Sequence, residues 1–251
     1  LESERQVREA GAVPATIGVL DGEIVVGLTE AELQRFDTTA RKLSPRDVAV
    51  CVAQGAVGAT TVGGTLAIAV AVGIRWMATG GLGGVHRGFP DPPDVSADLA
   101  QLARTRALVV SAGVKSLLDV PATAELLESL GVPVLGYRVD TLPLFYAAAG
   151  GPPVSARVES AGEAARIARA HWELGGGGLL LGRPPDVPLD DVEPLIARAL
   201  DEANAQGVHG QAVTPFVLGY LHRESGGRTQ RANKDLIAQN SRLAGEIAAA
   251  G

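Results

Sequence analysis

The other sequence patterns of this chain are arranged around one stretch, Ala107-Leu-Val-Val-Ser-Ala-Gly-Val-Lys115-Ser-Leu-Leu-Asp119. Its apolar, β-branched run predicts a buried strand, and small residues then lead to one long amine. In an open α/β sheet, ligands bind beyond the carboxyl ends of the strands, so a lysine there can carry chemistry. A Schiff-base lysine must be a neutral amine, which requires burial or a cationic neighbour. The alternative is a solvated Lys115 that pairs with Asp119 one helical turn later.

Strand and helix patterns alternate on both sides of this stretch. Strands are predicted at 16–20, 23–27, 74–78, 108–110, 132–137 and 179–181. Helices are predicted at 1–10, 30–37, 45–55, 66–73, 94–102, 122–130, 161–174, 190–206 and 233–249, with a further segment from 212. The alternation predicts an α/β protein, a three-layer α/β/α sandwich around a largely parallel or mixed central sheet. Because no linker and no internal repeat interrupts the pattern, we expect a single domain spanning residues 1–251.

Local signals fix several element ends in the first part of the chain. Asp21-Gly22 lies between two alternating runs and predicts a hairpin with a type I′ turn. Thr29 with Glu32 has the spacing of a capping box, and Ser44 before Pro45 opens another helix. The stretch from Gly58 to Thr65, rich in small and hydroxyl residues, is predicted as a turn that leads into a helix.

Composition and charge exclude several classes of protein. With 46% hydrophobic and 20% charged residues the chain can bury a substantial core. A net charge of -6, spread along the chain, gives no electrostatic footprint for nucleic acid, so we expect no nucleic acid polymer as partner. The single cysteine, Cys51, rules out an internal disulfide framework and fits a reducing compartment. No apolar run is long enough to span a bilayer and the first residues do not resemble a secretory signal, so we expect a cytoplasmic protein.

Two glycine-rich turns are candidates for binding a phosphate. The turns at 58–64 and 80–88 match neither the dinucleotide fingerprint nor the Walker pattern. Backbone N–H groups that glycine leaves accessible, with threonine hydroxyls beside them, can still hold a phosphate monoester. Each candidate has a structural alternative, such as capping or a surface ion pair. The candidate hydroxyl and charged residues are Thr60, Thr61, Thr79, Lys42, His86 and Arg87.

Asp94 and Asp98 are the candidate metal ligands. Their i, i+4 spacing places both carboxylates on one face if the segment is helical. One or two carboxylates, without a histidine or cysteine cluster, suit a divalent ion that keeps several waters. The alternative is that Asp94 caps the helix and the acidic first turn complements its dipole.

Taken in order, these motifs resemble the pseudouridine-5′-phosphate glycosidases, also called the indigoidine synthase A-like family. The resemblance covers nearly the whole chain. The matching motifs are Gly11-Ala-Val-Pro-Ala-Thr-Ile, Lys42-Leu-Ser, Gly58-Ala-Thr-Thr-Val62, Ala78-Thr-Gly-Gly-Leu-Gly-Gly-Val-His-Arg-Gly88, Asp94-Val-Ser-Ala-Asp-Leu99, Ser111-Ala-Gly-Val-Lys-Ser-Leu-Leu-Asp119, Gly131-Val-Pro-Val-Leu-Gly-Tyr, Ala212-Val-Thr-Pro-Phe and Ala232-Asn233.

The resemblance implies an activity and a set of site residues. The family reversibly cleaves the C–C glycosidic bond of pseudouridine 5′-phosphate to uracil and ribose 5-phosphate, with a divalent metal, usually Mn²⁺. By resemblance Lys115 attacks C1′ of the ring-opened sugar and holds it as an imine, Glu2 donates a proton and Asp94 binds the metal. A homotrimer is also implied. The residues that match substrate-binding positions are Lys42, Val62, Thr79, His86, Ser96, Ala97, Asp98 and Asn233.

One departure from the family pattern concerns the beginning of the sequence. The family has a His-Gly-x-Pro-x-Pro-x-Asn stretch after its Ala-Leu-Glu-Ser opening, whereas here Leu1-Glu2-Ser3 joins Glu4 directly. Either the stretch is deleted, or it is omitted from the printed sequence; we expect omission. A true deletion would favour a catalytically inactive sugar-phosphate-binding or regulatory homologue. A Schiff-base lyase that acts on another phosphosugar is a third alternative.

Overall fold

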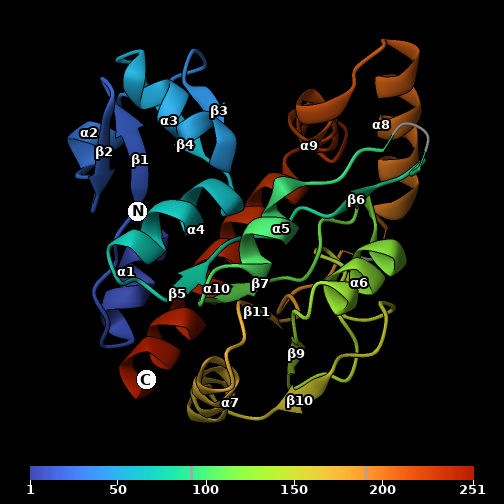
Figure 1. Cartoon of the computed structure of the whole chain (residues 1–251). Coiled ribbons are helices and arrows are strands. Elements are labelled where there is room, and N and C mark those ends of the chain that lie inside the picture. The colour runs from blue at the N-terminus through green and yellow to red at the C-terminus, as the bar shows by residue number, and fades with distance from the viewer. Residues whose placement is uncertain (91–92, 190) are drawn as a thin grey trace.

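Two principal β-sheets organise the computed structural model, which describes residues 1–90, 93–189 and 191–251 (Figure 1). The larger sheet has five parallel strands in the order β10-β9-β11-β7-β5. Its strands are β5 (Trp76–Ala78), β7 (Leu108–Ser111), β9 (Val134–Tyr137), β10 (Ala156–Val158) and β11 (Leu179–Gly182). The predicted strands at 74–78, 108–110, 132–137 and 179–181 are confirmed, whereas β10 was not predicted.

The helices are divided between the two faces of this sheet and the smaller sheet (Figure 1). They are α1 (Glu2–Glu9), α2 (Glu30–Leu33), α3 (Pro45–Ala53), α4 (Val62–Ala71), α5 (Ala97–Ala103), α6 (Val120–Ser129), α7 (Ala161–Glu173), α8 (Glu193–Ala205), α9 (Val213–Glu224) and α10 (Arg228–Ala250), with a 3₁₀ turn at Gly210–Ala212. The predicted helix from 190 begins at Glu193, and Asp190 lies outside the described residues. The final helix begins five residues earlier than predicted, because Gly227 in a left-handed conformation stops the preceding segment at that point.

Alternation along the strands divides the core into two layers. Leu108 and Val110 of β7 pack with α7 and α10, whereas Val109 between them packs with α5, α6, α8 and α9. In β11, Leu180 likewise joins the layer of Val109. Successive side chains on a strand point to opposite faces, so each face buries its own apolar set. The predicted three-layer α/β/α architecture with a parallel central sheet is confirmed.

The smaller sheet is built from the first 60 residues and lies apart from the five-stranded sheet, at the upper left of Figure 1. Its order is β2-β1-β4-β3, and the strands are β1 (Ile17–Leu20), β2 (Glu23–Val26), β3 (Arg41–Leu43) and β4 (Gly58–Thr60). The hairpin is confirmed, since Asp21 and Gly22 both have positive φ as a type I′ turn requires.

The prediction of a turn throughout Gly58–Thr65 was wrong at its start, where β4 pairs with β1 and β3. The physical reason is tertiary packing. A Cβ on Gly58 would come within 2.5 Å of the Leu43 side chain, so the missing side chain lets β3 and β4 pack closely. In a sequence, glycine usually indicates a turn. Here it belongs to a strand, because the neighbouring strand leaves no room for a side chain, and this cannot be recognised from the sequence.

Caps explain where several helices begin. The capping boxes of Thr29 with Glu32 and of Ser44 with Asp47 are both formed. At α5 the cap is Ser96, whose hydroxyl accepts from the Asp98 amide at 3.2 Å. The prediction that a helix begins at Asp94 was therefore wrong, and Asp94 and Asp98 do not share a helical face. The prediction of a single domain over residues 1–251 stays a prediction.

Within the residues described, no helix has the length and apolar composition needed to cross a membrane.

In the short two-stranded sheet, β6 (Val85–His86) pairs with β8 (Leu118–Asp119). This ribbon connects the turn after β5 to the segment after β7. It therefore brings His86 to the side of the molecule where the strands of the large sheet end.

Candidate active site

Lys115 lies beyond the carboxyl end of β7, in a segment that continues to pair with the turn after β5. The Ala112 amide donates to the Gly80 carbonyl at 2.9 Å, and the Lys115 amide donates to the Leu82 carbonyl at 3.2 Å. The predicted alternative, an ion pair with Asp119, was wrong: Asp119 belongs to β8 and its carboxylate caps α6 through the Ala122 amide at 3.0 Å. Lys115 therefore occupies the ligand-binding edge of a parallel sheet without that partner.

Burial lowers the pKa of the Lys115 amine below its ordinary value. The Asp98 carboxylate opposes this shift by favouring the ammonium form, and the positive charge of Lys42 adds to it. Desolvation and a like charge both disfavour the charged form of an amine. The site therefore contains a lysine with an increased share of neutral amine, the form that attacks carbonyl carbon.

His86 and Asp94 form a pair beside this lysine. The His86 amide donates to the Asp94 carbonyl at 2.9 Å, and the His86 Nδ1 atom lies 3.7 Å from an Asp94 carboxylate oxygen. Burial lowers the pKa of His86, Asp94 opposes that shift, and Lys115 and Lys42 add to it. A separation of 3.7 Å is too long for a hydrogen bond, so the Asp94 carboxylate keeps acceptor capacity for another group.

Asp98 is buried and joins three backbone segments. Its Oδ1 accepts from the Gly63 amide at 2.8 Å, and its Oδ2 accepts from the Gly83 amide at 3.1 Å. The residue is 4% exposed, so both oxygens are largely withdrawn from solvent, and backbone N–H groups satisfy them. This arrangement fixes the start of α4 against the glycine turn after β5. Direct contact of Asp98 with a substrate stays a prediction.

The turn that begins at Thr79 is supported by α10. The Thr79 amide donates to the Val110 carbonyl at 3.0 Å, and the Asn240 side-chain amide donates to the Thr79 carbonyl at 2.8 Å. A Cβ on Gly80 would lie 2.9 Å from the Asn233 Oδ1 atom, so Asn233 faces the turn directly. Asn240 was not predicted as a site residue. The sequence signal that could have identified Asn240 is an amide residue on the apolar face of a long helix.

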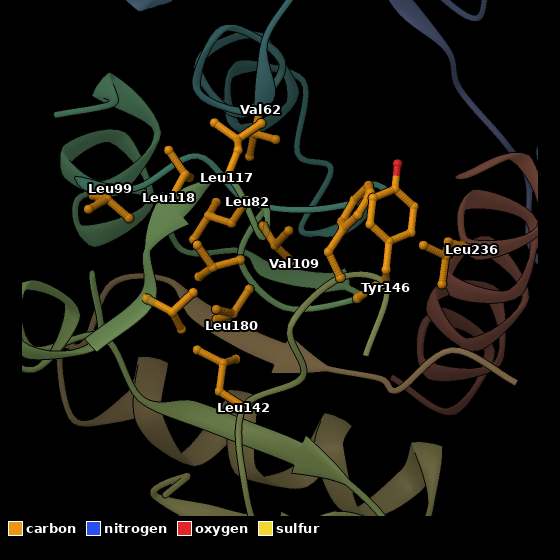
Figure 2. Close-up of a cluster of buried hydrophobic side chains, with 14 of the residues drawn as sticks. Val62, Leu82, Leu99, Val109, Leu117, Leu118, Leu142, Tyr146, Leu180 and Leu236 are labelled. Atoms are coloured by element: carbon orange, nitrogen blue, oxygen red, sulfur yellow. The ribbon is translucent and has the colours of Figure 1, made fainter. Parts of the chain in front are cut away.

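The remaining predicted substrate residues differ in accessibility. Val62 opens α4 and is buried in the core cluster with Leu82 and Leu99, as Figure 2 shows. Ala97 is exposed in the first turn of α5. Lys42 is exposed on β3, and its positive charge contributes to lowering the pKa of both Lys115 and His86. Their contact with a substrate stays a prediction.

The structure does not bring Glu2 into this group. Glu2 begins α1, is exposed, and accepts hydrogen bonds from Arg5 and Gln6, which lower its pKa to about 2. It lines a separate hollow of about 490 Å³ with Arg183 and Arg242. A carboxyl with such a pKa is ionised at neutral pH, and an ionised carboxylate has no proton to donate. The proton-donor role of Glu2 stays a prediction that this arrangement does not support.

A divalent metal has one candidate carboxylate here. Among residues 1–90, 93–189 and 191–251, no group of three or more His, Cys, Asp and Glu side chains could hold an ion. Asp94 retains acceptor capacity and is partly exposed, whereas both oxygens of Asp98 are taken by backbone amides. A single carboxylate fits Mg²⁺ or Mn²⁺ that keeps most of its waters or binds substrate oxygens. The donor set therefore fits such an ion and not a closed structural site.

A family model described as indigoidine synthase A like protein matches residues 1–250. A pseudouridine-5′-phosphate glycosidase of Herpetosiphon aurantiacus is 48% identical over 257 residues, which cover 100% of this chain and 85% of that relative. A protein of the same name from Myxococcus xanthus is 46% identical over 255 residues, covering 98% of this chain and 84% of the relative.

Two solved structures have closely similar folds. A prealnumycin C-glycosynthase in complex with ribulose 5-phosphate superposes with a TM-score of 0.91 at 45% identity, covering 99% of this chain and 84% of that one. An indigoidine synthase A-like protein from Thermotoga maritima superposes with a TM-score of 0.90 at 38% identity, covering 98% and 84%. The similarity therefore extends over the whole fold described above.

Proposed function

This chain belongs to the indigoidine synthase A like family, and we propose that it reversibly cleaves the C–C glycosidic bond of pseudouridine 5′-phosphate to uracil and ribose 5-phosphate. The single observation that carries the proposal is Lys115, a lysine whose pKa is lowered by burial at the carboxyl edge of a parallel sheet. Relatives named as pseudouridine-5′-phosphate glycosidases support the choice of substrate.

The proposed reaction uses the Lys115 amine first as the nucleophile and then as the donor of an electron pair. The Nζ atom bonds to C1′ as the C1′–O4′ ring bond breaks, and the proton lost from nitrogen is taken up at O4′. The C1′–C5 bond then breaks. Its electron pair takes a proton at C5 of uracil, while the nitrogen lone pair forms the C1′=N imine. Water hydrolyses the imine to ribose 5-phosphate and restores the amine, so one hard step becomes several easier ones.

Other residues of the site have distinct proposed roles. The amides of the glycine turns, with Thr79 and Asn233, bind the sugar phosphate, and Lys42 supplies positive charge near it. Asp94 holds the divalent metal, for which we propose Mn²⁺, and the metal polarises substrate oxygens when bound. Ser96 fixes the first turn of α5 beside this ligand. We also propose a cytoplasmic homo-oligomer, a trimer as the family resemblance implies.

A second candidate is C–C bond formation or cleavage on a different phosphosugar through the same lysine. The observation that favours it is the similar C-glycosynthase, whose complex contains ribulose 5-phosphate. Here the Lys115 nitrogen would join the carbonyl carbon of an open-chain sugar with loss of water, instead of displacing a ring oxygen. Uracil release distinguishes the two candidates, because only the first requires it.

The test follows both the product and the lysine. Uracil release from pseudouridine 5′-phosphate is measured with Mn²⁺ added or chelated, and ribose 5-phosphate is then trapped with borohydride. The sequence contains three lysines, Lys42, Lys115 and Lys234, so peptide mapping identifies the modified residue without ambiguity. We expect a reduced adduct on Lys115, and Lys234→Ala, an exposed position on α10, should leave it unchanged.

Three outcomes would change the proposal. An unmodified Lys115 under turnover conditions would overturn the Schiff-base mechanism. Binding of ribose 5-phosphate without uracil release would favour an inactive sugar-phosphate-binding homologue. An adduct that forms only with another phosphosugar would favour the second candidate.

A further inference from the structure

We propose that the Phe145 ring is a positioning residue for Lys115: it holds the lysine stem against the glycine turn after β5 and keeps water from the amine. The inference rests on the proposed function, because it concerns the lysine assigned there. Phe145 belongs to the loop 141–147, which follows β9 and was not predicted as part of the site. The argument depends on three features of this loop.

The loop packs directly against the segment that carries Lys115. The Phe145 amide donates to the Ala112 carbonyl at 2.9 Å, and Leu144 forms an isolated bridge with Gly113. Gly113 has a φ of +84°, and a Cβ there would lie 1.9 Å from the Pro143 carbonyl oxygen. Backbone therefore contacts backbone without intervening side chains, so a movement of the loop moves the Lys115 segment.

The Phe145 ring and the Lys115 stem converge on Gly81. A Cβ on Gly81 would lie 2.6 Å from the ring Cδ2 atom, 2.8 Å from Cε2 and 3.3 Å from the Lys115 Cγ atom. The space that a side chain at position 81 would fill is thus bounded by the ring and by the lysine. Phe145 is 3% exposed, so it presents an apolar wall rather than a solvent-facing surface.

The backbone of Phe145 is strained in a way that packing must offset. Its φ is +64°, a left-handed conformation that a bulky residue rarely adopts and that costs about 1–2 kcal/mol. The Tyr146 ring packs edge-on against it with centroids 4.6 Å apart. In Figure 2 Tyr146 lies at the side of the buried cluster that faces Leu236 of α10. Strain of this kind is retained where the surrounding structure fixes it, and it is concentrated at functional sites.

The expected chemical consequence concerns the ionisation of Lys115. The charged and titratable groups that act on it are Asp98 from α5, Lys42 from β3 and His86 from β6. Burial is nevertheless the largest cause of its lowered pKa. We infer that Phe145 contributes to this burial, because its ring and the Lys115 stem both lie against Gly81. Removing the ring admits water, which favours the ammonium form and raises the pKa.

The test measures the protonation of Lys115 directly. The protein of residues 1–251, as wild type, Phe145→Gly and Phe145→Leu, is labelled with acetic anhydride across pH, and modification of Lys115 is quantified by mass spectrometry with Lys234 as internal reference. We expect the labelling midpoint of Phe145→Gly to rise by about one pH unit, with a smaller rise for Phe145→Leu. Trapping by ribose 5-phosphate and borohydride should fall about tenfold at pH 7 and recover near pH 10. An unchanged midpoint in both variants would overturn the proposal.

Two comparisons exclude a merely structural effect. Glycine at position 145 removes the backbone strain as well as the ring, so a purely conformational role predicts no rise in the midpoint. Phe36→Ala is the matched control, since Phe36 also presses on a glycine, with Cζ 2.6 Å from the Cβ position of Gly18 in the small sheet. It should not move the Lys115 midpoint. If Phe145→Gly does not fold, Phe145→Leu decides.

The labelling experiment separates this inference from the proposed function. The midpoint needs no substrate, so it reports on Phe145 whether or not the chain is a lyase. A raised midpoint together with no sugar adduct in the wild type would contradict the proposed function alone. A sugar adduct in the wild type with an unchanged midpoint in Phe145→Gly and Phe145→Leu would contradict this inference alone.

Discussion

The family resemblance implies catalytic roles for both Lys115 and Glu2, yet the surroundings of the two side chains differ fundamentally. Lys115 follows a buried strand, and burial is the main cause of its lowered pKa. Glu2 lies on the exposed first turn of α1, and hydrogen bonds from Arg5 and Gln6 lower its pKa to about 2. A lowered pKa has opposite meanings for the two groups. It favours the reactive neutral form of a lysine, whereas it removes the proton that a general acid must supply.

The largest effect should come from removing the amine at position 115. Lys115→Met keeps an apolar stem of similar length but cannot form an imine, so we expect uracil release to fall at least about 1000-fold. Steady-state assays with pseudouridine 5′-phosphate and Mn²⁺ measure the loss. Lys234→Ala, which removes an exposed amine on α10, should retain wild-type activity. Substantial activity in Lys115→Met would mean that the reaction does not pass through this lysine.

Most of the architecture and part of this site could be predicted from the sequence. Alternating strand and helix patterns indicated the layers, and Asp21-Gly22, Thr29 and Ser44 marked turns and caps through local chemistry. The loop 141–147 could not be recognised, because its role depends on contacts with residues 112–113 and 80–81 that only the folded chain brings together. Glycine at position 58 gave the wrong signal for the same reason.

The position of the site could be predicted from the sequence more readily than which of its two carboxylates is available to a ligand. Asp94 and Asp98 look equivalent in sequence, but the cap at Ser96 places one before the helix and the other inside it. Asp98 then receives two backbone amides, while Asp94 lies beside His86. Spacing alone does not specify which carboxylate remains available to a ligand. The hydrogen bonds of the folded chain specify it.

An effect of intermediate size is expected for Asp94, which belongs to the same candidate site as Lys115. Asp94→Asn removes the carboxylate charge but keeps the size of the side chain, so we expect the Mn²⁺ concentration for half-maximal activity to rise about 10- to 100-fold. Titration calorimetry with Mn²⁺ provides a measurement that does not depend on turnover. Asp235→Asn, an exposed position on α10, is the matched control. Equal Mn²⁺ affinity in wild type and Asp94→Asn would remove Asp94 as the metal ligand.

Glu2→Gln tests the other side of the comparison. Loss of a general acid usually lowers the rate by about 10²- to 10⁴-fold. Because Glu2 is exposed and ionised in this arrangement, we expect uracil release to change by less than about threefold. Formation of the borohydride-reduced adduct on Lys115 should be unchanged in the same variant. A hundredfold fall in uracil release with normal adduct formation would show that Glu2 reaches the site in another conformation, and the contrast with Lys115 would then disappear.

The smallest expected effect concerns stability and is also a test of the buried amine. The pKa of Lys115 is lowered from its ordinary value of 10.5, so between the lowered value and 10.5 the unfolded chain binds more protons than the folded one. Stability contributed by this group therefore rises as pH rises through that window, and the ammonium form destabilises the fold below it. Asp98 limits the penalty because its carboxylate favours the ammonium.

Lys115→Met removes this penalty, so at pH 7 the variant should be more stable than the wild type by about 1 kcal/mol while being inactive. The difference should shrink as the pH approaches 10, because the wild-type lysine then becomes neutral in both states. Urea denaturation of both proteins at pH 7, 8.5 and 10 measures it. Exchanging Glu2 for glutamine should give no comparable gain, since its ionised form is favoured by its partners. A less stable Lys115→Met at pH 7 would show that the amine is not held at an energetic cost, and the physical basis for its reactivity would be lost.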